Sequence, residues 1–271
     1  MNKSQKILGL TFLILMVLAL SNFLNLVSAT TSIKNDRDSV EMILIPAGEF
    51  LMGSALGEGR TDERPQRKVY LDVYEIDVTE TTNDSYLKFI HSTRRKEPIN
   101  PYSDKKLSAE PNIGDLPVVQ ITWYDAVDYC RWVGKRLPTE AEWEKAARGD
   151  KGFIFPWGSD SPKPKEVNFQ QNWAGTNTLW PVGSVSQNSS PYGVKDMAGN
   201  VREWTNDWYS SDYYSLGINK NPKGPQKGIL KVIKDGSWHS FKADIRSAAR
   251  GKGGFALKTD GIGFRCAKSI K

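Results

Sequence analysis

The chain has 271 residues, 39% of them hydrophobic, and a formal net charge of +6 at pH 7. Its Lys and Arg residues are scattered among Asp and Glu, which argues against a nucleic-acid-binding or polybasic membrane-binding function. With only two histidines and two cysteines, the chain has too few ligands for a catalytic zinc, copper or non-haem iron site built on several His or Cys side chains.

The N-terminus has the pattern of a secretory signal peptide. Two lysines precede an apolar run over 7–20, and Val27-Ser28-Ala29 resembles a signal-peptidase site, so we expect cleavage before Thr30. An uncleaved anchor is the alternative, although the run is shorter than the roughly 20 residues that span a bilayer. We predict export to the periplasm or the medium and no membrane association beyond the signal peptide. The expected parts are a signal peptide (1–29), a polar leader (30–40) and one domain (41–271).

Strands are predicted at both ends of this domain. The segments 41–46 and 49–52 flank Ala47-Gly48, which predicts a short hairpin. A further strand is predicted over 69–76 from its imperfect alternation of apolar residues, and a terminal strand over 261–267. From 152 onward we expect short strands and loops, with no helix longer than two turns.

Three helices are predicted between the first strands and residue 149. The first covers 82–91. The second begins at the capping-box pair Thr122 and Asp125 and stops at Gly134, and the third opens at Thr139 with Glu142 and runs to 148. The class is therefore α+β with low regular content.

The two cysteines are Cys130, on the apolar face of the second predicted helix, and Cys266 in the last strand. An even cysteine count in an exported chain favours one disulfide. Two unpaired buried thiols are the alternative.

Several blocks of sequence together resemble one family. The most specific are RLPTEAEWE (136–144), within a block that begins at 123, and DMAGNVREW (196–204); the others are 45–54, FPWG (155–158), DGSW (235–238) and GFRCA (263–267). They resemble the formylglycine-generating enzyme (sulfatase-modifying factor) family, in family order over about 41–268. The resemblance implies an irregular α+β fold related to C-type lectins.

The resemblance also implies a structural calcium ion and a disulfide. The calcium ligands would be the carboxylates of Asp196 and Glu203 and the backbone carbonyls of Gly199 and Val201, which are oxygen donors of the kind Ca²⁺ accepts. The alternative is that these two acids only cap turns. In vertebrate-type members of the family, the cysteines that match Cys130 and Cys266 pair with each other.

The founding reaction of the family oxidises a substrate cysteine with O₂ and a Cu(I) ion held by two cysteine thiolates. In this chain, Ser240 matches the first of these cysteines, and the second falls at Asp244 or Ile245. Hydroxyl and aliphatic groups do not replace thiolates around Cu(I). Copper-dependent formylglycine formation is therefore not expected, and copper is not an expected cofactor.

Three functions remain open for a chain of this kind, of which a formylglycine generator with unusual chemistry is the most remote. An accessory or binding domain would present a loop surface to an unknown protein, peptide or small-molecule partner in the cell envelope. Its aromatic contact residues would come from Trp173, Trp180, Trp208, Tyr209, Tyr213 and Tyr214. The alternative is an oxidoreductase-type modifying enzyme, for protein maturation or natural-product tailoring.

Such an enzyme would use the same pocket without the cysteine pair. Its catalytic residues would be drawn from Ser237, His239, Ser240, Asp244 and Arg246. His239 would act as general base, oriented by Asp244. The simpler interpretation makes His239 an ordinary histidine and Arg246 the partner of a buried carboxylate.

Overall fold

The computed structural model describes residues 33–34, 37–100, 103–174 and 178–270. The predicted signal peptide and residues 30–32 and 35–36 of the predicted leader lie outside these residues. Three α-helices are confirmed: α2 (Asn83–Thr93), α3 (Trp123–Trp132) and α4 (Glu140–Arg148). Thr122 and Thr139 each close a capping box, which explains why α3 and α4 begin at the predicted positions. Short 3₁₀ turns are η1 (Thr61–Glu63), η2 (Leu107–Ala109) and η3 (Tyr213–Leu216).

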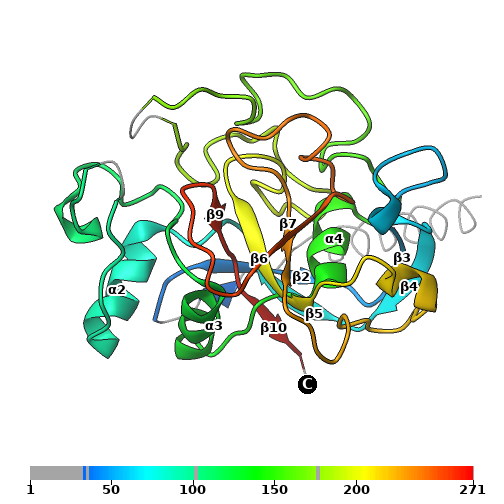
Figure 1. The fold of residues 1–271 in the computed structure, drawn as a ribbon, viewed down its shortest axis with the longest axis horizontal. Coiled ribbons are helices and arrows are strands. Elements are labelled where there is room, and N and C mark those ends of the chain that lie inside the picture. Colours follow the sequence, from blue (N-terminus) through cyan, green and yellow to red (C-terminus); the bar gives the residue numbers. More distant parts are fainter. Residues whose placement is uncertain (1–32, 35–36, 101–102, 175–177, 271) are drawn as a thin grey trace, which may run out of the picture. The chain divides into compact units, whose positions relative to one another are not determined.

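The described strands form three sheets (Figure 1). One has the order β1-β2-β5-β10, the second pairs β3 with β4, and the third has the order β8-β7-β6-β9. Only the β6–β9 pair is parallel among these ladders. The strands are β1 (Ile33–Lys34), β2 (Glu41–Ile45), β3 (Gly48–Met52), β4 (Arg67–Leu71), β5 (Tyr74–Asp77), β6 (Arg202–Trp208), β7 (Lys231–Lys234), β8 (Arg250–Gly253), β9 (Ile262–Gly263) and β10 (Ala267–Ser269).

The predicted hairpin over 41–52 is wrong. Both strands exist, but β2 pairs with β5 and β3 pairs with β4, so the chain changes sheets between them. The strand predicted over 69–76 is likewise divided, because the chain changes sheets again between β4 and β5. At this break the amide of Asp72 donates to the Asn221 side chain instead of a ladder partner (2.9 Å). Two nearby segments therefore form two separate ladders.

The terminal strand is also divided, into β9 and β10. The residues between them place Phe264 and Cys266 in the hydrophobic core and Arg265 in a fully buried position. Cys266 forms a disulfide with Cys130 of α3, across 136 residues of sequence. The C-terminal segment is thereby fixed against α3.

Helix α4 connects the site described below to the core. Its Ala141, Trp143 and Ala147 are buried, and it packs against β3, β6 and β7 (Figure 1). Helices α2 and α3 contact each other and enclose a second core with Tyr129 and Phe264. Among the residues that the structure describes, no helix is long and apolar enough to cross a membrane.

Candidate functional site

The segment 235–246 brings together three of the predicted site residues. Ser237 Oγ lies 3.0 Å from His239 Nδ1 and 3.3 Å from Ser240 Oγ, and the Ser237 amide donates to Ser240 Oγ at 2.9 Å. Ser237 is fully buried, whereas His239 is exposed. A Cβ added to Gly261 would lie 3.0 Å from Ser237 Oγ, so the backbone at Gly261 covers this hydroxyl. The pair has the geometry of a serine and its base, but the serine is enclosed.

The other two predicted residues face a different element. Asp244 forms an ion pair with Arg60, in the loop between β3 and β4, and not with His239. Arg246 binds both carboxylate oxygens of Glu63, at 2.8 Å each, and also contacts Ser54. Asp244 and Arg246 therefore hold the 54–63 loop against this segment. This geometry agrees with the interpretation of Arg246 as the partner of a buried carboxylate.

Glu63 and Arg246 belong to a larger set of buried ion pairs, which we call the paired cluster. It contains three acids and four basic residues: Glu63, Glu140 and Glu144, with Arg246, Arg250, Arg148 and Lys234. Each carboxylate in it has at least one cation within 3.0 Å. The cluster joins α4 to β7, β8 and the 54–63 loop.

Two carboxylates of the paired cluster, Glu63 and Glu144, ionise readily despite being buried. Burial opposes ionisation of Glu63, but hydrogen bonds from Arg246 and Ser54 outweigh it, and the pKa of Glu63 is lowered. Burial likewise opposes ionisation of Glu144, yet the charges of Lys234 and Arg148 and the amide of Gly53 lower its pKa. Both groups are thus stabilised as carboxylates.

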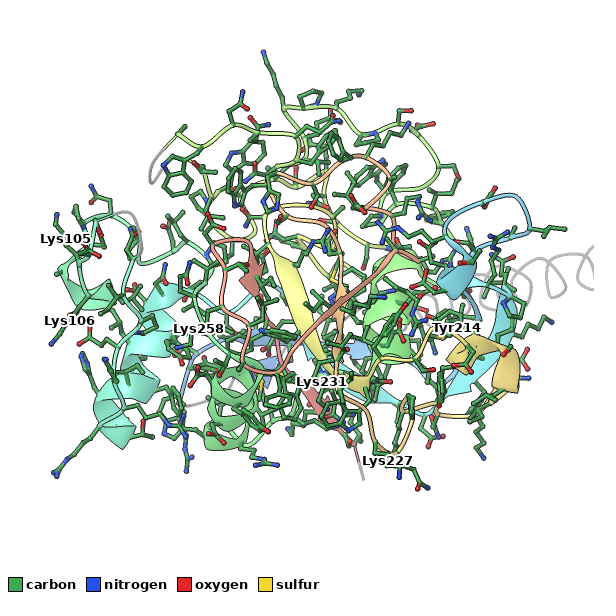
Figure 2. The ribbon with its side chains drawn as sticks, viewed as in Figure 1. Lys105, Lys106, Tyr214, Lys227, Lys231 and Lys258 are labelled. Atoms are coloured by element: carbon green, nitrogen blue, oxygen red, sulfur yellow. A yellow bond between two sulfur atoms is a disulfide. The ribbon has the colours of Figure 1, made fainter. Side chains whose placement is uncertain are left out.

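Tyr214 packs against the paired cluster and is fully buried (Figure 2). Its ring contacts the guanidinium groups of Arg67 and Arg250, at 4.1 and 4.4 Å, and its hydroxyl donates to Glu140. Tyr213 is also buried. The prediction that these two tyrosines form an exposed contact surface is therefore wrong. Trp173 of the same predicted set is 43% exposed.

The positions that match the copper-binding cysteines do not fit Cu(I). Ser240 is buried, and its hydroxyl is used by Ser237. Ile245 is fully buried in a hydrophobic cluster with Phe155 and Phe169, and Asp244 pairs with Arg60. None of these side chains supplies a thiolate, and both cysteines of the chain are joined to each other.

The loop predicted to bind calcium lies in a second buried set, which we call the acid-rich cluster. It contains four acids and one guanidinium: Glu80, Asp196, Glu203 and Asp235, with Arg265. Arg265 is fully buried and pairs with Glu203 at 2.7 Å, and it also donates to the carbonyls of Val78 and Asp196. Glu80 accepts from the Asn200 side chain and the Val201 amide.

Three acids of this cluster ionise with difficulty. Burial, opposed in part by the Gly183 amide and Arg265, raises the pKa of Asp196 to about 6. Burial and the charges of Asp196 and Glu203 raise the pKa of Glu80 well above its usual range. Burial does the same to Asp235, although the amides of Gly236 and Gly199 oppose it. The cluster therefore has more carboxyl groups than Arg265 alone stabilises in the ionised form.

The predicted calcium ligands fit this geometry in part. Glu203 receives four contacts on its two oxygens, three from Arg265 and one from Trp143 Nε1, which fills the positions of a carboxylate. The side-chain carboxylate of Asp196 accepts one hydrogen bond, from the Gly183 amide. Asp235 Oδ2 and Asn168 Oδ1 are buried without a described donor. No group of three or more His, Cys, Asp or Glu side chains forms a metal site within the described ranges.

Sequence reasoning missed several residues that organise both clusters. Glu80 precedes α2, and Glu63 ends the short 3₁₀ turn η1, so neither follows a periodic pattern. Arg265 was within a recognised block, but only its burial beside Glu203 reveals its role. A charged residue inside an apolar terminal segment is the local signal by which it could have been found.

Comparison with known proteins agrees with the fold and the sequence blocks. The family model described as "Sulfatase-modifying factor enzyme 1-like domain" matches residues 28–270. The formylglycine-generating enzyme of Mus musculus is 32% identical over 279 residues, which cover 84% of this chain and 74% of the mouse protein. The solved structure of PvdO from Pseudomonas aeruginosa has a TM-score of 0.76 and 28% identity, and covers 89% of this chain and 98% of PvdO.

A third relative is longer than this chain. The serine/threonine-protein kinase pkn1 of Chlamydia caviae is 37% identical over 246 residues, which cover 85% of this chain but 38% of the kinase. The chain thus spans well under half of the length of this relative. From the match of the family model over nearly all of its described residues, and from its likeness to the mouse enzyme, the chain belongs to the sulfatase-modifying factor enzyme 1-like (FGE-sulfatase) family.

Proposed function

We propose that this chain is an exported accessory or binding domain on the formylglycine-generating enzyme scaffold, and that it does not make formylglycine by copper chemistry. The observation that carries the proposal is the number of cysteines and the way they are bonded. The chain has two cysteines, both joined in the Cys130–Cys266 disulfide, while Ser240 and Asp244 or Ile245 stand where the resemblance expects copper ligands. Cu(I) needs soft ligands, which these side chains do not provide.

The contacts of the 54–63 loop support a binding role over a catalytic one. Arg60 and Glu63 engage Asp244 and Arg246, so the segment expected to line a catalytic pocket is bonded to a loop of the same chain. Ser237 is fully buried beneath Gly261. These contacts and the burial of Ser237 support a role that the domain performs through its surface.

The alternative is a modifying enzyme that uses Ser237 and His239. Its support is the 3.0 Å contact between Ser237 Oγ and His239 Nδ1. A fluorophosphonate probe, which labels activated serines, separates the two proposals. The accessory role predicts no labelling above that of Ser237→Ala, whereas labelling that disappears in Ser237→Ala and His239→Ala would establish the enzyme.

Export is a second part of the proposal. It is supported by the signal-peptide pattern of residues 1–29 and by the disulfide, since disulfides persist in oxidising compartments. Cell fractionation of the full chain, followed by mass measurement, should give a mature protein that begins at Thr30. A cytoplasmic, full-length product would contradict export.

Calcium is proposed as a structural ion of the acid-rich cluster. The excess of carboxyl groups and the buried oxygens without described donors support a cation there. Asp196 and the carbonyls of Gly199 and Val201 would hold it, while Glu203 stays with Arg265. Bound calcium would offset the negative charge of the loop and fix its backbone.

The direct functional test is oxygen uptake with a cysteine-containing sulfatase peptide, after incubation of the purified domain with copper. We expect no uptake above buffer and no aldehyde in the peptide by mass spectrometry. The control peptide has Ser in place of Cys and reports background oxidation. Copper-dependent conversion of the Cys peptide alone would overturn the proposal.

A further inference from the structure

An apolar pocket lined by no residue of either ion-pair cluster lies between the N-terminus of α2 and the segment 98–120. It encloses about 90 Å³, several times the roughly 10–15 Å³ that one water needs. Its apolar walls include Leu107, Leu116 and Leu179. A pocket of this size and lining suits one small ring or a short alkyl chain.

The charged groups in this pocket are all acidic. Glu110 and Asp260 contribute to the lining, and none of the described lining residues is Lys, Arg or His. Glu110 accepts hydrogen bonds from the side chains of Asn100 and Ser103, and no described Lys or Arg forms an ion pair with it. Lys105 and Lys106 lie on the same segment but are exposed and do not line the pocket (Figure 2). A carboxylate beside apolar walls favours a ligand of opposite charge.

One wall of the pocket contains an aromatic residue, the kind of side chain that attracts a cation. Trp173 lines the pocket, is 43% exposed, and packs against Trp238 with ring centroids 5.8 Å apart. Trp238 in turn donates through Nε1 to the carbonyl of Asp260. The indole of Trp173 is thereby held beside the acidic part of the pocket, where an ammonium group gains from both the ring and the carboxylates.

We propose that this pocket binds a small organic ammonium ion, with its hydrocarbon part against Leu107, Leu116 and Leu179 and its charge beside Glu110 and Asp260. The net charge of the whole chain is positive, so long-range attraction does not account for such binding; the local arrangement does. Of the segment 235–246, only Trp238 takes part, as the support of Trp173. No metal takes part, so the outcome of this proposal is independent of the proposed absence of copper chemistry.

Isothermal titration with three ligands of nearly equal shape tests the charge preference. The probes are 2-phenylethylammonium, the neutral 2-phenylethanol and the anionic 3-phenylpropionate. We expect the ammonium ion to bind tightest, by about fivefold to tenfold over the alcohol, because it adds one charge-assisted contact. Equal affinity for ammonium and alcohol, or tighter binding of the anion, would overturn the proposal.

Two variants place the binding in this pocket. Glu110→Gln should lower the ammonium affinity towards that of the alcohol, since only Asp260 then remains, whereas Glu58→Gln, an equivalent change at an exposed loop position, should leave it unchanged. The indole N–H signal of Trp173, assigned from its loss in Trp173→Phe, should shift when the ammonium ion is added. If Glu110→Gln binds like Glu58→Gln, or the Trp173 signal stays fixed at saturation, the site is elsewhere and the proposal is wrong.

Discussion

The paired cluster and the acid-rich cluster both bury carboxyl groups, but they differ in the number of cations beside these groups. In the paired cluster, Glu144 has Lys234, Arg148 and the Gly53 amide, and its pKa is lowered. In the acid-rich cluster, four carboxyls surround Arg265 alone, and burial raises the pKa of Asp196 and Glu80. The comparison shows that a buried acid is stabilised as a carboxylate only where the fold also delivers a cation. Otherwise it needs a proton or a metal ion.

The largest expected effect is the loss of the single cation of the acid-rich cluster. Arg265→Met leaves Glu203 buried without its partner and removes donors from the carbonyls of Val78 and Asp196. We expect a decrease of about 3–5 kcal/mol in the free energy of unfolding, measured by urea denaturation. Arg136→Met is the control, since Arg136 is 37% exposed and should cost about 1 kcal/mol or less. Equal costs would show that Arg265 is not central to the cluster.

A smaller and pH-dependent effect is expected in the paired cluster. Glu144→Gln should cost about 2–3 kcal/mol near neutral pH, because it leaves Lys234 buried without a carboxylate. Glu63 and Glu144 have lowered pKa values in the folded state, so their contribution is present above the unfolded value of 4.5 and is lost as the pH falls through the folded values. The difference between wild type and Glu144→Gln should therefore shrink on acidification, and a constant difference would contradict the assignment.

The third expected effect is a change in stability on adding calcium, which should depend on the acid-rich cluster and not on the paired cluster. If the ion binds at Asp196, adding calcium to about 100 times its dissociation constant should stabilise the domain by about 2.7 kcal/mol, and EGTA should reverse this. Asp196→Ala should abolish the response, whereas Glu144→Gln in the paired cluster should retain it. A thermal unfolding midpoint that changes with neither calcium nor EGTA would contradict the proposed calcium site.

The sequence predicts local features of this molecule better than its long-range pairings. Capping boxes at Thr122 and Thr139 act within one turn, and both helices begin where these residues indicate. The hairpin predicted over 41–52 failed because alternation identifies strands but not their partners. For the same reason, the sequence did not predict that the segment 69–76 is divided between two sheets.

The candidate site shows the same contrast between local and distant information. Ser237, His239 and Ser240 lie within four residues of one another in sequence, and the structure brings them together. Arg246 and Asp244 meet Glu63 and Arg60, which are 183 and 184 residues away in sequence. No spacing rule connects such positions, so the loop that covers the segment could be found only from the folded chain.

Anaerobic Cu(I) titration against a competing chelator tests the central claim most directly. The mature domain is kept oxidised, and the double variant Ser240→Cys with Ile245→Cys serves as the matched control with a thiol pair restored. We predict that the wild-type domain leaves the metal with the chelator, because its only two cysteines are joined in the disulfide. One tightly held Cu(I) per wild-type chain would contradict the account and restore copper-dependent chemistry to this protein.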